Sequence, residues 1–340
     1  MWDLSPLPIV GAPMAGVGTP QLTAAISDAG GLGLFPGGYL TGDVLAEGVA
    51  RIRELTDRPF GVNLFLPTPV DEERDGDQLR SYAEQLAPVA ASAGELLPEP
   101  RWDGADHFAA KLEVLERDPV AVVSFIFGPP PVDAVRRLHA VGTRVLATVT
   151  DAQEAEAASA AGADLLCLQG TDAGGHRGTH RVDAEPNTSG WRELLPQVLA
   201  VTELPVVVAG GVMSAQDVAA ALAAGAVAVQ CGSAFLLTDE AGINDAYRAG
   251  FTAADLTETV VTRVFSGRPA RAIRNEFVAS FDPVAPPVYP IVNQLTKPLR
   301  AAGAASGNRE LISLWAGTGW RQARPGRAAD VVAALAAKVV

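Results

Sequence analysis

Short apolar runs recur along the first 240 residues, and a helical pattern follows each of them. There are eight: PIVGAPM (8–14), GLGLFP (31–36), FGVNLFL (60–66), AVVSFIFG (121–128), TRVLATVT (143–150), ADLLCLQG (163–170), PVVVAGGV (205–212) and AVAVQCGS (226–233). The runs are continuously apolar rather than alternating. This predicts strands that are buried on both faces, as in a parallel sheet covered by helices.

The segments between these runs carry the start and stop signals of α-helices. Residues 19–30, 151–162 and 214–225 begin with Thr, Asp or Ser and end with Gly. The first three types cap free N–H groups, and Gly accepts the left-handed conformation that closes a helix. Eight such units predict an α/β fold, a (β/α)8 TIM barrel. A doubly wound dinucleotide-binding sheet is less consistent, because Pro36 stands where the third glycine of GxGxxG would be.

Two segments interrupt this pattern. Residues 67–107 are rich in Pro and acidic residues and form an excursion after the third strand. Residues 252–323 follow the eighth strand and lack the barrel period. We therefore expect a barrel made of residues 1–251 plus 324–340. A small, mainly helical subdomain, residues 252–323, is inserted after strand 8 as a lid over one mouth.

Composition and charge narrow the classes of function. With 48% hydrophobic residues, the 340-residue chain can bury a large core, while its net charge of −13 argues against nucleic-acid binding. Its two cysteines, Cys167 and Cys231, exclude a disulfide framework. The uncharged stretch 218–237 is interrupted by glycines, which favours helix, turn and strand over a membrane span. We expect a cytoplasmic protein with no membrane or nucleic-acid partner.

The strand ends that should meet at the barrel mouth carry polar and glycine-rich signals. Gly210, Gly211 and the segment 230–233 follow the seventh and eighth strands, where barrels of this kind bind phosphate through backbone N–H groups. Asn63 and Gln169 end the third and sixth strands. Their amides suit a ring with alternating donors and acceptors, such as a flavin, although each could instead tie down a neighbouring loop.

The segment QGTDAGGHRG (169–178) holds the best candidate for a reacting group. Its glycines would let the backbone approach a ligand, and His176 is the candidate general base. His176 and His180 could share a metal ion only if this segment were helical, which its Gly-Gly pair disfavours. We therefore expect no metal site.

Several pieces of the chain resemble the nitronate monooxygenases, which are FMN-dependent (β/α)8 barrels. The matching pieces are PIVGAPMAG (8–16), GGLGLFPGGYL (30–40), TDRPFGVNLF (56–65), QGTDAGGHRG (169–178), PVVVAGGV (205–212), AVQCGSAFLLTDE (228–240) and SGRPARAIRNEF (266–277). The resemblance implies that His176 is the catalytic base or electrostatic partner. It implies FMN contacts at Met14, Asn63, Gln169, Gly174, Gly211, Gln230, Cys231, Gly232 and Ser233. This chain has Asp172 where Glu is more usual, and Cys231 and Ser233 where many members have Met and Thr.

The reaction implied is oxidation of alkyl nitronates, and of nitroalkanes if His176 removes a proton, by O2 to carbonyl compounds and nitrite. The resemblance leaves a homodimer open. An FMN-dependent NAD(P)H:quinone or enoyl-acyl-carrier-protein reductase of the same superfamily is the nearest alternative, and a flavin-free barrel acting on a phosphorylated metabolite is a distant one. Because the chain is acidic, we expect its anions to be held by local N–H groups and His176.

Overall fold

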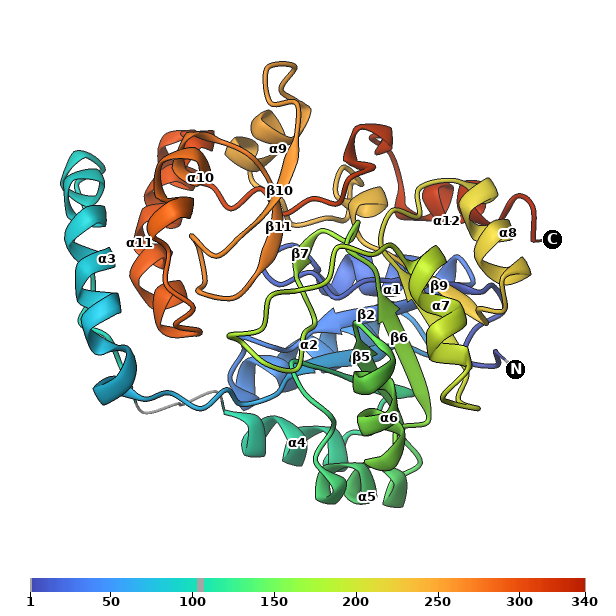
Figure 1. Ribbon diagram of the computed structural model, residues 1–340. Coiled ribbons are helices and arrows are strands. Elements are labelled where there is room, and N and C mark those ends of the chain that lie inside the picture. Colours follow the sequence, from blue (N-terminus) through green and yellow to red (C-terminus); the bar gives the residue numbers. More distant parts are fainter. Residues whose placement is uncertain (1, 103–106, 340) are drawn as a thin grey trace.

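Eight parallel strands close into a barrel in the order β1–β2–β3–β4–β5–β6–β8–β9 (Figure 1). They are β1 (Ile9–Gly11), β2 (Leu32–Pro36), β3 (Gly61–Phe65), β4 (Val122–Ile126), β5 (Arg144–Val149), β6 (Leu165–Gln169), β8 (Val206–Ala209) and β9 (Ala228–Cys231). The computed structural model describes residues 2–102 and 107–339. Each predicted apolar run contains one of these strands, so the predicted TIM barrel is confirmed.

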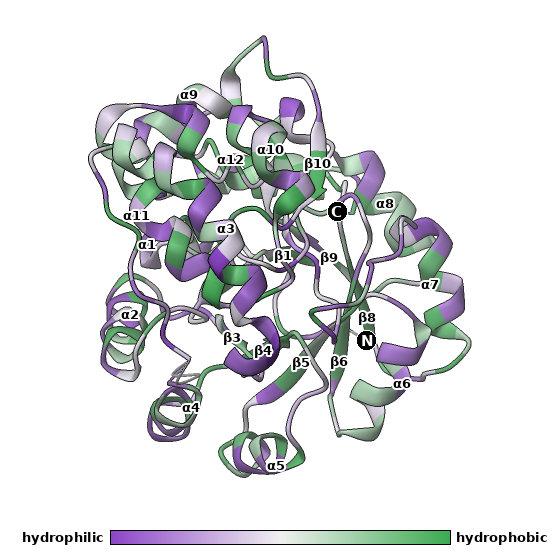
Figure 2. Cartoon of the chain, turned by 60° about the vertical axis from the view of Figure 1, so that its left-hand side comes forward, coloured by the Kyte–Doolittle hydropathy of each residue, from purple (hydrophilic) through white to green (hydrophobic). Residues whose placement is uncertain are grey.

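Helices surround the barrel and join its strands. They are α1 (Pro20–Asp28), α2 (Gly42–Leu55), α4 (Phe108–Arg117), α5 (Val132–Ala140), α6 (Ala152–Ala160), α7 (Trp191–Leu199), α8 (Ala215–Ala223) and α12 (Ala328–Ala336). The predicted caps are present: Asp151 accepts from the Glu154 N–H, and Ser214 and Asp217 form a capping box. The helices carry both apolar and polar residues, as α5 and α7 show in Figure 2, because only one side of each faces the strands.

The core has one layer inside the barrel and one between strands and helices. Leu34, Leu146 and Val207 belong to the inner layer, and all three are buried. The uncharged stretch 218–237 forms most of α8 and then β9 in this core. Among the described residues, no helix is both long and apolar enough to cross a membrane.

A second group of elements covers the mouth at the C-terminal ends of the barrel strands. It contains β7 (Gly175–His176), α9 (Asp245–Thr252), β10 (Thr259–Thr262), β11 (Ala270–Ile273), α10 (Glu276–Phe281) and α11 (Ile291–Ser306). Short 3-10 turns lie at Ser233–Phe235, Asp282–Val284, Arg309–Leu311 and Trp320–Gln322. The strands β10, β11 and β7 pair in that order, and sequence patterns did not predict them because none of them lies in one of the eight apolar runs.

The excursion after β3 joins this second group. Its long helix α3 (Glu72–Ser92) lies beside α11 (Figure 1), and its buried Leu86 belongs to the same apolar cluster as Phe265 and Leu295. The Tyr82 hydroxyl donates a 2.7 Å hydrogen bond to the Val264 carbonyl. Residues 67–92 therefore pack with the proposed lid, and the predicted domain limits at 252 and 323 stay a prediction.

Candidate active site

A cavity of about 490 Å³ lies at the barrel mouth, between the strand ends and the covering elements. Every residue predicted for the site lines it: Met14, Asn63, Gln169, Gly174, His176, Gly211, Gln230, Cys231, Gly232 and Ser233. These residues come from five separate parts of the chain, and the closed barrel brings them together. Their individual roles remain predictions.

His176 is held over the cavity by a strand that the barrel itself does not contain. β7 leaves the end of β6 and pairs antiparallel with β11, His176 opposite Ala270. A 2.9 Å hydrogen bond joins His176 Nε2 to Ser266 Oγ. Ser266 is buried and comes from the segment between β10 and β11, so the covering elements fix the position of the imidazole.

Aromatic rings enclose the imidazole. Trp315, Phe127 and Tyr289 have ring centroids 5.5, 5.7 and 5.9 Å from that of His176. Phe127 has φ of 82° at the end of β4, a left-handed conformation that is strained for a bulky residue, at a cost of about 1–3 kcal/mol. This conformation holds its ring between the imidazole and the buried Arg268, whose guanidinium lies 4.0 Å from the ring centroid.

The surroundings of His176 keep it neutral. Burial, followed by the positive charges of Arg268 and Arg300, lowers its pKa to about 3. Arg268 is itself desolvated, which lowers its pKa to about 10, so it stays charged near neutrality. The site thus combines a neutral imidazole with cationic surroundings, an arrangement that favours an anionic ligand.

The two amides have different surroundings. Gln169 Nε2 donates to the His176 carbonyl at 2.9 Å, and its Oε1 accepts from the Gly178 N–H at 2.8 Å. Gln169 therefore holds the loop that carries His176. Of the two roles that the sequence left open for this amide, flavin contact or fixing a neighbouring loop, these hydrogen bonds fit the second. Asn63 Nδ2 donates to Ser124 Oγ at 2.8 Å, and no described residue donates to its Oδ1.

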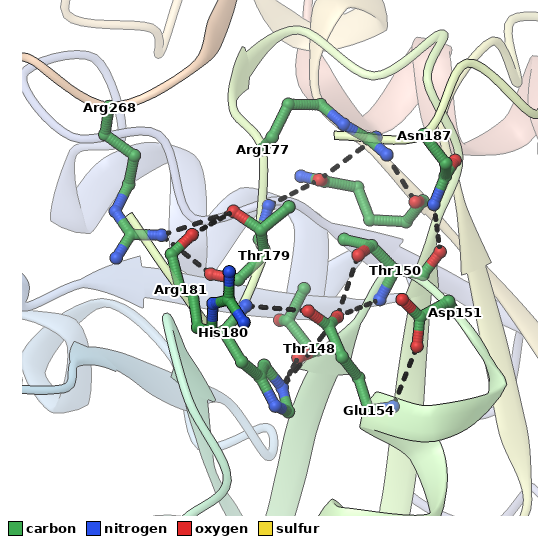
Figure 3. A network of polar contacts seen from close by, with 12 residues as sticks. Thr148, Thr150, Asp151, Glu154, Arg177, Thr179, His180, Arg181, Asn187 and Arg268 are labelled. Atoms are coloured by element: carbon green, nitrogen blue, oxygen red, sulfur yellow. Dashed lines mark hydrogen bonds and ion pairs between the residues drawn. The ribbon is translucent and has the colours of Figure 1, made fainter. Parts of the chain in front are cut away.

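Figure 3 shows a polar network beneath the same loop. Arg177 is fully buried and donates from Nη1 to the Gly170 carbonyl at 2.5 Å. Glu154 on α6 accepts from the backbone N–H groups of Thr150 and His180, both at 2.7 Å. His180 therefore belongs to the polar network that supports the loop. Among the described residues, no group of three or more His, Cys, Asp and Glu side chains could hold a metal ion.

Glycines line the end of the cavity nearest β8 and β9. Gly211 has φ of 72°, and a Cβ on it would lie 3.1 Å from Asp172 Cβ. A Cβ on Gly174 would lie only 2.5 Å from the Gly317 nitrogen. Ser233 Oγ accepts from that same N–H at 2.9 Å. Four distant segments therefore approach one another closely at this end of the cavity, where glycine lets the backbone come near a phosphate.

The covering elements add site residues that sequence reasoning missed. Ser266, Arg300, Trp315 and Gly317 line the cavity, and all lie within 252–323. Lys297 and Arg300 also line the cavity, so an anion there has cationic side chains nearby in addition to the expected N–H groups and His176. Two signals were available: Ser266 opens the matching piece SGRPARAIRNEF (266–277), and Gly317 belongs to the glycine-rich AGTG at 316–319. Cys231 is buried, which raises the pKa of its thiol to about 12 and keeps it protonated.

The arrangement can be compared with known proteins. The family model for nitronate monooxygenase matches residues 1–338. The chain belongs to the nitronate monooxygenase family. Members of this family are oxidoreductases, and the cavity of about 490 Å³ at the barrel mouth is within the usual size of a ligand site.

Two nitronate monooxygenases illustrate the relationship. That of Pseudomonas aeruginosa is 41% identical over 343 residues, covering 96% of this chain and 95% of its own length. That of Paraburkholderia phytofirmans is 38% identical, with 96% and 91% covered. Both span this nitronate monooxygenase family member nearly end to end.

Solved structures share the architecture of this family member. Nitroalkane oxidase from Streptomyces ansochromogenes superimposes with a TM-score of 0.95 at 47% identity, over 99% of this chain and 96% of that one. FabK from Thermotoga maritima gives 0.73 at 26% identity, over 98% and 93%. Nitronate and nitroalkane oxidation is therefore the activity that these relatives support.

Proposed function

We propose that this protein binds FMN and oxidises alkyl nitronates with O2 to carbonyl compounds and nitrite. The observation that carries the proposal is the neutral His176 in an aromatic-walled cavity, close to the buried Arg268 and the half-buried Arg300. A nitronate is an anion, so Arg268 and Arg300 favour its binding over that of a neutral molecule.

The residues present fit FMN. The glycine-lined end at Gly211, Gly232 and Gly174 offers backbone N–H groups for a phosphate, and the volume is within the range of about 300–1,000 Å³ typical of ligand sites. Asn63 also lines the cavity, and no described residue donates to its Oδ1. FMN, when bound, supplies the electron transfer that side chains cannot.

His176 orients and stabilises the substrate in this proposal. A neutral imidazole with one nitrogen already bonded to Ser266 has its other nitrogen left for a substrate oxygen or α-proton. A histidine whose pKa is about 3 is a weak base. Nitronates, which have already lost the α-proton, should therefore be better substrates than nitroalkanes.

Oxygen consumption tests the proposal. Purified protein with added FMN should show flavin absorbance and consume O2 with ethylnitronate and with propionate 3-nitronate, releasing nitrite. NADH oxidation with a quinone or an enoyl thioester serves as the control. Rapid NADH oxidation without nitronate turnover would replace this proposal by a reductase, and a failure to bind any flavin would refute both.

A further inference from the structure

A second cavity, of about 470 Å³, lies beside the first. Four residues line both cavities: Tyr39, Phe65, Asn293 and Lys297. The two spaces are thus separated by a single layer of side chains, which we call the partition.

The partition is held in place from the barrel side. The Phe65 ring contacts the Tyr39 ring edge-to-face at 5.0 Å and lies 6.4 Å from the His176 ring. A Cβ on Gly38 would lie 2.6 Å from atoms of the Phe65 ring, so glycine is required there. Lys111, fully buried, donates to the Gly38 carbonyl at 2.8 Å and so fixes the loop that carries Tyr39.

Part of the partition lies at the surface. Tyr39 is 44% exposed, and Lys297 is also exposed, whereas Phe65 is half-buried. Exposed side chains change rotamer quickly, although rotation of Tyr39 would break its hydrogen bond to Tyr289 and its edge contact with Phe65. Rotation of Tyr39 and Lys297 would therefore open a passage from the second cavity to the imidazole.

The walls of the second cavity suit a hydrocarbon group. The lining combines the charged side chains of Glu99, Arg101 and Lys297 with rings and prolines, which are Tyr39, Phe65, Tyr289, Pro98, Pro290 and Pro298. Proline fixes its own backbone angle, which makes such a wall preformed. Gln294 adds two hydrogen bonds to the backbone of Arg101, at 2.9 and 3.0 Å, and these link α11 to the loop before α4.

The geometry points to the second cavity as the subsite for the alkyl or aryl arm of the substrate, whose reacting carbon lies beside His176. The inference rests on the proposed nitronate oxidation and names the part of the substrate that the barrel site alone does not hold. A buried methylene group contributes up to about fourfold in binding, so kcat/KM should rise with chain length.

The test compares linear nitronates from ethyl to hexyl. In the wild-type protein, we expect kcat/KM to increase along the series. Thr68 lines the second cavity and not the first. Thr68→Trp should lower the hexyl-to-ethyl ratio of kcat/KM by about tenfold or more, as expected when several methylene groups lose their burial. The same substitution at the exposed Thr252 should leave that ratio at its wild-type value.

A second variant, Tyr39→Ala, opens the partition and should raise the ratio, which keeps the test decisive if Thr68→Trp does not fold. A flat chain-length series in the wild type, or equal losses for ethyl and hexyl nitronates in Thr68→Trp, would overturn the subsite; equal losses would make the cavity a common access route. Absence of turnover with every nitronate would instead refute the proposed function.

Discussion

At the scale of single residues, the environment of His176 determines what chemistry the site can perform. The sequence places a histidine after two glycines, but its protonation depends on groups far away in the chain, Arg268 and Arg300. An isolated histidine titrates near pH 6.5, whereas this one stays neutral throughout the physiological range.

Replacement of His176 tests its role. His176→Asn should keep FMN, because the glycine-lined end is untouched, and should lose most turnover. We expect a loss of about 100-fold or more with nitroethane, which requires proton removal, and a smaller loss with ethylnitronate. His139→Asn is the matched control, because His139 lies on the outer helix α5, where its Nε2 is hydrogen-bonded to Asp164. A near-normal rate with nitroethane would show that His176 is not the base.

The pH profile tests the depressed pKa. Above a pKa of about 3, His176 is neutral, so raising the pH removes no proton from it. We expect kcat/KM with ethylnitronate to be constant from about pH 5.5 to 8, where an ordinary histidine titrates. The measurement is initial oxygen consumption across that range with preformed nitronate. An inflection near pH 6.5 that disappears in His176→Asn would contradict this reading.

At the scale of elements, the turns after the barrel strands form the binding surface. The turn after β8 needs left-handed backbone at Gly210 and Gly211, with φ of 108° and 72°. The residues there were predictable because strand ends converge in any parallel barrel. The loop after β6 was less predictable, because β7 is stable only through its pairing with β11.

Two glycine substitutions separate backbone strain from binding. Gly211→Ala and Gly142→Ala both place alanine at positive φ, 72° and 79°, and this backbone strain should cost each about 1–2 kcal/mol of stability. Gly211→Ala adds a 3.1 Å contact of its Cβ with Asp172 Cβ. Only Gly211 lines the cavity. We therefore expect FMN to bind at least about tenfold more weakly to Gly211→Ala alone, measured by fluorescence titration. Equal FMN affinity in the two variants would place the phosphate elsewhere.

At the scale of the whole molecule, the barrel and its cover are built from different apolar clusters. The cluster that contains α3, α10 and α11 is separate from the barrel core. The cover nevertheless supplies Ser266, Arg300 and Trp315 to the cavity. The site therefore needs both parts to be folded.

A substitution that removes packing from the cluster of α3, α10 and α11 tests whether this cluster and the barrel unfold separately. Leu86 on α3 is fully buried, and Leu86→Ala should cost about 2–5 kcal/mol. We expect faster hydrogen exchange in α3 and α11 and retained protection in β5 and β6, measured by mass spectrometry. Leu96→Ala serves as the control, since Leu96 is 89% exposed. Uniform loss of protection would mean that barrel and cover unfold together.

The sequence by itself determined the barrel, because continuous apolar runs, caps and closing glycines are local signals of buried strands and their helices. It also placed Asn63, Gln169, His176 and the glycines at one mouth, since the C-terminal ends of parallel strands meet there. Only the tertiary structure decided the rest. The pairing of β7 with β11, the charges that hold His176 neutral and the cavity behind Tyr39 all arise between residues that are far apart in the chain. Burial and Coulomb interactions depend on distance in space rather than along the chain.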